Sequence, residues 1–281
     1  MASVGASFLQ PSRPLEVNPP LSSEPSRPED ASASATLIAY LDEVDPLADD
    51  ESLQLRETLL NELLNLFRVW VRTVGVAKGI LDSDDDCGSE ATPGGTMFVS
   101  GSYKLGVASA SSDIDCILVA PRFVHRDDFF ATLPPLLREQ PGVSEILSIA
   151  EAKVPIIELV YRGVAIDLLF ASLPLTSVPA TLNILDDSLL QGLDEASIIT
   201  LNGPRVTELI FRSVPDPGTF KVVLRALRYW AKVSPALCDR WCGEAAMRCE
   251  PFVYSLLAHC RHVICPGSWY LLKQNGLSWW R

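Results

Sequence analysis

One strand-like segment restricts the fold more than any other part of the chain. Residues 164–170, VAIDLLF, are apolar except for Asp167. An apolar run of this length predicts a buried β-strand, and a carboxylate in such a strand is costly to bury unless it is paired or binds a metal ion. We therefore expect a sheet in which other charged groups lie close to Asp167.

A second segment, Asp113–Ala120 (DIDCILVA), is also read as a strand and supplies two more carboxylates. Asp113 and Asp115 are two residues apart, so they project from the same face of the strand. Three oxygen donors that converge at one end of a sheet suit hard cations such as Mg²⁺. Two such ions could activate an attacking hydroxyl and stabilise a leaving group. Solvated acids at strand ends would explain any one of the three, but explain the set less well.

A Gly-Ser pair, Gly101-Ser102, precedes these acids in a turn that leads into a predicted helix. Glycine lets the backbone approach a phosphate, whose oxygens can then be bound by helix-start N–H groups and the serine hydroxyl. The pair alone says little because it is frequent in turns. Followed by Asp113, Asp115 and Asp167, it favours phosphate binding.

The remaining pattern predicts an α+β fold with a mixed, mostly antiparallel sheet and helices on one face. Arg162-Gly163 is a hairpin signal between two of its strands. The further strands are Met97–Val99, Val143–Ala150, Pro155–Tyr161 and Val164–Phe170. Helices are expected at Ala35–Leu41, after Asp49–Ser52, at Arg126–Gln140 with an interruption at Pro134-Pro135, and from about Leu189 onward.

Charge and cysteine content limit the function classes. The formal net charge is −12, which argues against nucleic-acid binding by the whole surface. Two of seven cysteines, Cys87 and Cys116, lie in the first 232 residues, which fits a reducing compartment better than a disulfide framework. No apolar run approaches the roughly 20 residues of a membrane helix. We expect an intracellular protein without membrane contact, and we keep an N-terminal transit peptide as an alternative.

A basic strip is predicted on the helix Phe220–Val233. Its cations recur every three or four residues and therefore share one face, with an apolar face behind them. Four cations on one face suit a triphosphate or an RNA backbone, and we favour phosphate contact over a solvated face. The cations are Lys221, Arg225, Arg228 and Lys232, and the apolar residues are Val223, Leu227 and Trp230.

Taken together, these motifs resemble the nucleotidyltransferase superfamily that includes DNA polymerase β. Its pattern, an apolar residue before G[GS], then [DE]-apolar-[DE] and a third acid, is read here in Val99–Ser102, Asp113–Asp115 and Asp167. The surrounding runs GSYKLGVASASSDIDCILVAPRFVHRDDFF, EAKVPIIELVYRGVAIDLLFASL and LNGPRVTELI are similar to eukaryotic nuclear poly(A) polymerases. Terminal uridylyltransferases and CCA-adding enzymes share the acids but not these runs.

The resemblance covers roughly residues 35–232 and implies template-independent addition of AMP from ATP to RNA 3′ ends, as in mRNA polyadenylation. It implies that Asp113 and Asp115 bind two Mg²⁺ or Mn²⁺ ions and that Asp167 binds the ion next to the RNA 3′-OH. It also implies a nuclear location and recruitment by cleavage and polyadenylation factors. The implied ATP-binding residues are Ser100, Gly101, Ser102, Ser109, Asp113, Ile114, Asp115, Asp167, Asn202 and Arg228. For Asn202, a plain turn residue in Asn-Gly-Pro is an equally good interpretation.

Composition and the resemblance together suggest a domain order. From their prolines and serines, we expect residues 1–34 to be a disordered Pro/Ser-rich arm, followed by N-terminal helices in 35–80 and the catalytic palm domain in 81–188. Residues 189–232 begin a helical middle domain, and 233–281 are an atypical Cys/Trp-rich tail.

Several positions depart from the family pattern. Ser100 stands where an aromatic residue is usual, Ser109 where threonine is, and Arg228 where the triphosphate-binding lysine is; arginine differs from lysine in reach and geometry. Leu237 stands at the place of a nucleotide-contacting tyrosine. These differences keep a second hypothesis open, in which the chain is a catalytically inactive fragment or a non-catalytic RNA- or protein-binding module.

The sequence after Lys232 no longer resembles that of the family. Read-through or a mispredicted splice junction is the favoured explanation for this segment. Its last residues, NGLSWW, hint that family-like sequence resumes there. Zinc binding is the alternative, although the spacings match no common zinc motif well. Its candidate ligands are Cys238, Cys242, Cys249, His259, Cys260, His262 and Cys265.

Overall fold

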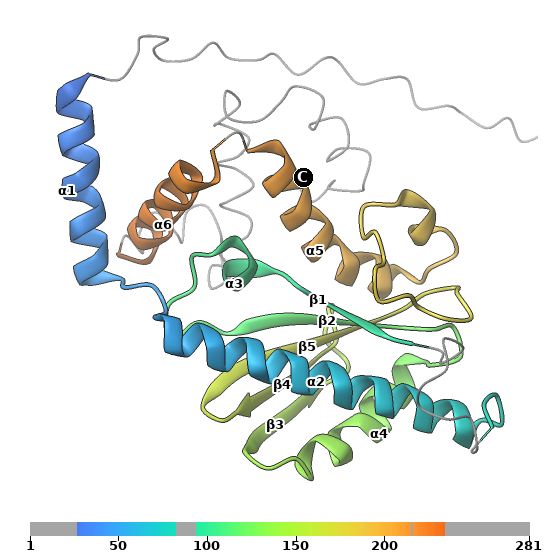
Figure 1. Cartoon of the computed structure of the whole chain (residues 1–281). Coiled ribbons are helices and arrows are strands. Elements are labelled where there is room, and N and C mark those ends of the chain that lie inside the picture. Colours follow the sequence, from blue (N-terminus) through green and yellow to red (C-terminus); the bar gives the residue numbers. More distant parts are fainter. Residues whose placement is uncertain (1–26, 83–93, 215, 234–281) are drawn as a thin grey trace, which may run out of the picture.

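A computed structural model describes residues 27–82, 94–214 and 216–233 (Figure 1). The atypical tail, apart from Val233, lies outside these residues, as do Cys87 and most of the predicted arm. The helices are α1 (Pro28–Val44), α2 (Asp50–Ala77), α3 (Gly101–Leu105), α4 (Arg126–Arg138), the 3₁₀ helix η1 (Asp187–Leu190), α5 (Glu195–Ser213) and α6 (Pro217–Val233). The strands are β1 (Thr96–Val99), β2 (Ile114–Ala120), β3 (Val143–Ile149), β4 (Ile156–Tyr161) and β5 (Val164–Ser172).

The five strands form one sheet in the order β1-β2-β5-β4-β3. Only β2 and β5 pair in parallel; the other three pairs are antiparallel. The predicted mixed, mostly antiparallel sheet is therefore confirmed. Arg162 and Gly163 join β4 to β5 with φ angles of +46° and +83°, which is the backbone of a tight hairpin turn that matches the twist of the strands.

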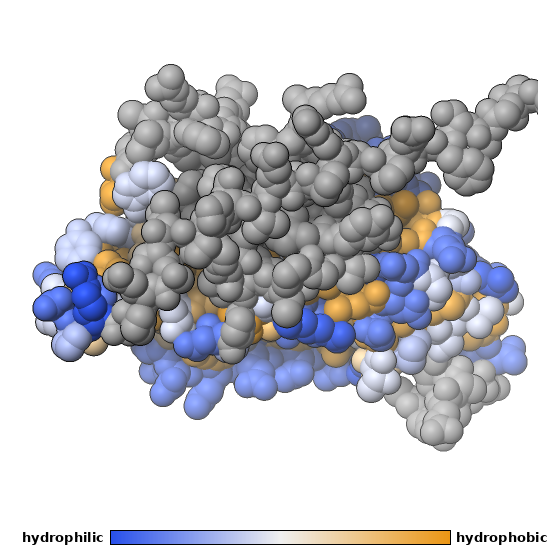
Figure 2. All heavy atoms as spheres, turned by 90° about the horizontal axis from the view of Figure 1, so that it is seen from above, coloured by the Kyte–Doolittle hydropathy of each residue, from blue (hydrophilic) through white to orange (hydrophobic). Residues whose placement is uncertain are grey.

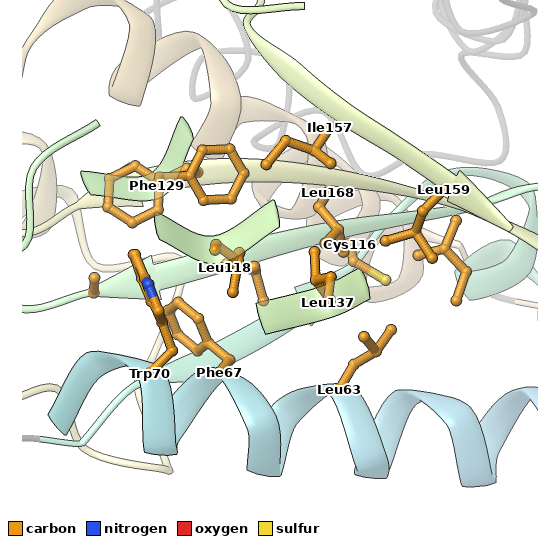
Figure 3. Close-up of a cluster of buried hydrophobic side chains, with 14 of the residues drawn as sticks. Leu63, Phe67, Trp70, Cys116, Leu118, Phe129, Leu137, Ile157, Leu159 and Leu168 are labelled. Atoms are coloured by element: carbon orange, nitrogen blue, oxygen red, sulfur yellow. The ribbon is translucent and has the colours of Figure 1, made fainter. Parts of the chain in front are cut away.

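One face of the sheet, which we call the core face, packs against α2 and α4. Leu63, Phe67 and Trp70 of α2 lie against side chains of the strands, and the Phe129 ring of α4 stacks on Phe170 (Figure 3). Apolar residues of α2 recur every three or four positions, so a single stripe of this 28-residue helix is buried along the sheet. This layer is the main hydrophobic core.

The opposite face is partly covered by α5, η1 and the segment before them, which corrects the expectation of helices on one face only (Figure 1). Because strand side chains alternate, Ile117 and Val119 of β2 and Ala171 of β5 point to this side and are buried there with Leu201 of α5. Asp115 and Asp167 belong to the same alternation. We call this the carboxylate face.

Two predicted helices differ from the structure, one in its extent and one in its continuity. The first helix begins at Pro28, so residues 28–34, predicted to lie in the arm, are helical; proline is well suited to the first helical position. The helix α4 continues through Pro134 and Pro135, although proline cannot donate a helical hydrogen bond. Burial of Phe129, Leu133 and Leu137 on one side of α4 holds the helix in place.

Hydrophilic side chains line the lower edge of the face seen in Figure 2, with apolar ones among them. Among the described residues, no helix combines the length and the apolar character that crossing a membrane requires.

Candidate active site

The parallel pairing of β2 and β5 places two of the three predicted acids side by side. Asp115 is in register with Asp167, and neighbouring strands are about 4.8 Å apart. Both side chains are half-buried on the carboxylate face. Burial and the nearby charges of Asp115 and Asp167 raise the pKa of the Cys116 thiol, which therefore stays neutral in the core. The two carboxylates thus lie side by side at the sheet centre.

Asp113 lies just before β2 and is exposed. It precedes Asp115 by two residues, so it continues the same row at the end of the strand. In the part of the chain that the structure describes, no three His, Cys, Asp or Glu side chains come close enough to form a metal site by themselves. The structure thus brings Asp115 and Asp167 together, whereas the convergence of all three acids stays a prediction.

Gly101, the first residue of α3, lies directly against Asp115. A Cβ atom at Gly101 would lie 2.2 Å from Asp115 Oδ2, and its φ of +65° is in the left-handed region. Glycine is the residue that adopts this conformation at no steric cost. The backbone N–H of Ser100 donates to the Asp115 carbonyl, 3.0 Å away. The Gly-Ser turn and the strand acids thus form one unit, with Ser102 half-buried on α3.

Two other predicted ATP-binding residues have different settings. The Ile114 side chain is fully buried in the main core, so only its backbone can face the carboxylate side. Asn202 lies within α5, which excludes its interpretation as a turn residue. The next residue, Gly203, approaches the Gly-Ser turn closely, because a Cβ there would be 3.3 Å from Ser100 Oγ. The helix α5 thus borders the site.

The loop between α3 and β2, residues 106–113, carries Ser109 at its centre. The Ser109 hydroxyl is hydrogen-bonded with those of Ser111 and Ser112 at 3.2 and 3.1 Å, and its backbone N–H donates to Ser112 Oγ at 2.9 Å. These contacts order the loop locally, next to the acids.

The basic strip on α6 is used differently from the prediction. Arg225 is buried and donates to the carbonyls of Leu41 and Asp45 and to the Asp42 carboxylate at the end of α1. Lys232 lies 3.7 Å from Asp45 Oδ1. Arg225 holds α1 against α6, because a buried guanidinium needs hydrogen-bond partners, and Lys232 adds an ion pair on the surface.

The other two cations of α6 reach the loop. Arg228 Nη1 donates to the Val107 carbonyl, and Lys221 lies against Gly106, where a Cβ would be 2.7 Å from its Nζ. The apolar face was also misplaced: Phe220 and Leu224 are buried, whereas Val223 and Trp230 are exposed.

One residue of this region was missed by the sequence analysis. Arg56 of α2 is 1% exposed and donates through Nη2 to the carbonyls of Ala110 and Ser109, at 2.8 and 3.4 Å. The available signal was a single cation within the apolar stripe of α2, three and four residues before Leu59 and Leu60.

Known proteins that are similar to this chain identify its family. The family model described as "Poly(A) polymerase nucleotidyltransferase domain" matches residues 17–214. Poly(A) polymerase pla1 of Schizosaccharomyces pombe is 37% identical over 216 residues, which are 77% of this chain and 37% of that protein. Nuclear poly(A) polymerase 1 of Arabidopsis thaliana is 37% identical over 228 residues, 81% of this chain and 31% of that protein. The chain thus spans about a third of the length of these curated relatives.

Solved structures resemble the chain more weakly. A cytoplasmic RNA terminal U-transferase has a TM-score of 0.42 at 14% identity, covering 72% of this chain and 44% of that one. A non-canonical poly(A) polymerase complex, GLD-2–GLD-3, has a TM-score of 0.31 at 20% identity, covering 49% and 39%. These likenesses are too weak to assign any residue. The family match, which spans α1 to α5 and includes the Gly-Ser turn and all three acids, carries the conclusion: this chain belongs to the poly(A) polymerase nucleotidyltransferase family.

Proposed function

We propose that the chain is a polynucleotide adenylyltransferase, which transfers AMP from ATP to RNA 3′ ends and releases pyrophosphate. The observation that carries the proposal is the register of Asp115 with Asp167, with Gly101 packed against the Asp115 carboxylate. The family membership and the names of the curated relatives support the same reaction. We extend the proposal to mRNA polyadenylation in the nucleus, with recruitment by cleavage and polyadenylation factors.

The donor set fits divalent cations. Magnesium is usually held by one or two carboxylates together with substrate phosphates, rather than by a complete cage of protein ligands. Asp115 and Asp167 would supply the carboxylates, Asp113 would join them at the strand end, and the close fit of Gly101 leaves room for no side chain there. Two Mg²⁺ or Mn²⁺ ions bound to these acids would stabilise charge on the attacking and leaving oxygens.

The residues of the chain would bind and orient the substrates. The Gly101-Ser102 turn would receive the triphosphate beside the acids, where backbone N–H groups can bind its oxygens. Ser109 and the Ile114 backbone would border the nucleotide from β2 and its preceding loop, and Ser100 would border it from the start of α3. Asn202 of α5 would lie on its other side. Arg228 would contribute positive charge next to the loop, because only its Nη1 is committed to the Val107 carbonyl by a hydrogen bond.

One observation favours the second candidate, a non-catalytic member of the family. Arg225 and Lys232, which were expected to contact phosphate, are engaged with α1 instead. Fewer cations are therefore available for the triphosphate. An inactive protein that still binds RNA or a protein partner is the function that this observation supports.

A primer-extension assay distinguishes the adenylyltransferase from the non-catalytic candidate. The purified chain would be given an oligo(A) RNA, Mg²⁺ and each nucleoside triphosphate in turn. We expect extension with ATP, loss of extension in Asp113→Ala and Asp115→Asn, and no loss in Asp127→Asn, an exposed carboxylate at the start of α4. A folded wild-type protein that does not extend the primer refutes the adenylyltransferase and favours the non-catalytic candidate. Extension that survives Asp115→Asn refutes the role of the acids.

A further inference from the structure

The loop that carries Ser109 and Asp113 is held from outside by α2, by α6 and by the connection between α1 and α2. Four consecutive carbonyls, those of residues 107–110, each accept a hydrogen bond from beyond the loop. The donors are Arg228 Nη1 to Val107, the Ala48 N–H to Ala108 at 2.9 Å, and Arg56 Nη2 to both Ser109 and Ala110. Arg56 thus holds the two carbonyls nearest to Asp113.

Arg56 occupies an unusual place for a charged group. It lies in the stripe of α2 that packs on the sheet, and its side chain is almost fully buried. Its Nε donates to Ser52 Oγ at 3.4 Å, whereas its Nη1 is buried without a hydrogen-bond partner among the described residues. A buried donor without a partner destabilises the folded state, so the residue is not explained by stability alone.

The charge of Arg56 also interacts with Asp113 of the candidate site. Burial lowers the pKa of Arg56, and the neighbouring Tyr103 and Asp113 oppose that shift. Arginine remains protonated even so. A positive charge therefore lies behind the loop, close enough to interact with Asp113.

We infer that Arg56 is a positioning residue for AMP transfer: through the Ser109 and Ala110 carbonyls it holds the loop so that Ser109 and Asp113 stay aligned with Asp115. This inference rests on the proposed function. Arginine suits the task because its planar fork of donors can bind neighbouring carbonyls together, while the ammonium of lysine is a point charge without that geometry.

The chain offers a matched control in Arg205 of α5. It too is buried, holds loop carbonyls (Ile184 and Asp186) and has a buried nitrogen, Nε, without a hydrogen-bond partner. The loop that it holds, however, carries none of the proposed site residues. Loss of Arg205 should therefore reproduce the structural effect of losing Arg56 without the effect on the reaction.

The test uses the full chain as wild type, Arg56→Met, Arg56→Lys and Arg205→Met. Primer extension gives kcat and KM for ATP, corrected for the folded fraction. Hydrogen exchange of the amides of residues 107–112 reports directly on the loop. For Arg56→Met we expect faster exchange there and a kcat/KM lower by about 10–100-fold, the usual effect of removing a residue that orients a ligand from behind, with kcat falling more than KM changes. Arg56→Lys should recover part of both, and it replaces Arg56→Met if that variant does not fold.

The outcomes are distinct. Wild-type kcat/KM in Arg56→Met overturns the inference, and so does lost activity without faster loop exchange. An equal loss of kcat in Arg205→Met also overturns it, because the effect would then follow from general destabilisation. A wild-type chain that transfers no AMP refutes the proposed function separately, and loop exchange alone then decides whether Arg56 holds the loop.

Discussion

Gly101→Ala should slow AMP transfer about 100-fold while the protein remains folded. Gly101 has a φ of +65°, and an added Cβ would lie 2.2 Å from Asp115 Oδ2. Real Cβ contacts almost never fall below 3.0 Å, so the carboxylate oxygen or the turn must move by at least about 0.8 Å. The left-handed backbone adds a cost of about 1–2 kcal/mol for a residue with a side chain.

The effect on the reaction follows from that displacement. A misplacement of about 1 Å at a reacting group can lower the rate about 100-fold, and Asp115 belongs to the pair of acids proposed to act in AMP transfer. We therefore expect kcat for ATP-dependent primer extension to fall by about two orders of magnitude. The free energy of unfolding, measured by urea titration, should fall by about 1–2 kcal/mol.

Gly163→Ala is the matched control for backbone strain. Gly163, in the β4–β5 turn, has a φ of +83°, but a Cβ there would meet no atom within 4 Å. This variant should lose a similar amount of stability and keep wild-type kcat. Equal kcat in Gly101→Ala and wild type would refute the argument, as would an equal loss of kcat in both variants, since strain rather than displacement of Asp115 would then be the cause.

Two further predictions concern the supporting structure. Arg225→Met should release α1, because the Asp45 carbonyl loses its Arg225 donors and the Leu41 carbonyl keeps only the Asp45 N–H. An unsatisfied buried group costs about 1–3 kcal/mol. Faster hydrogen exchange confined to residues 28–45 would be the sign, and wild-type protection of α1 would count against the prediction. Asp194 at the start of α5 is partly desolvated, which raises its pKa, but hydrogen bonds from Ser197 and the charge of Arg126 outweigh this and leave the pKa lowered. Its stabilising contribution should therefore be complete above the unfolded pKa of about 3.9 and be lost as the pH falls through the lower folded value. Urea titrations between about pH 6 and pH 3 should show a smaller loss in Asp194→Asn than in wild type, and identical losses would contradict the assignment.

The strands of the sheet could be predicted because their sequence patterns are local. The strand over residues 164–170 is an apolar run that directly follows a two-residue hairpin turn. The strand Asp113–Ala120 carries its acids at one end. Their register could not be predicted, because it depends on a parallel pairing between segments separated by a helix and two further strands. The alignment of Asp115 with Asp167 is thus a property of the whole sheet.

The helices show the same limit more clearly. The spacing of Lys221, Arg225, Arg228 and Lys232 correctly indicates a shared side of α6, but not what lies opposite. The partner of Arg225 is α1, about 180 residues earlier in the chain. Arg56 posed the reverse problem, since a single cation in an apolar helical stripe gives no indication of the loop that it holds.

Folding and the candidate site both depend on how the side chains of β5 alternate between the two faces of the sheet. Ile166 and Leu168, on either side of Asp167, are fully buried on the core face. A shift of one residue in register would exchange the two sets and would bury the Asp167 carboxylate against α2, at a cost of several kcal/mol for an unpaired charge. The register that buries the most apolar surface is therefore also the one that aligns Asp167 with Asp115. Because of this, the carboxylates need contribute nothing to stability to be held in place.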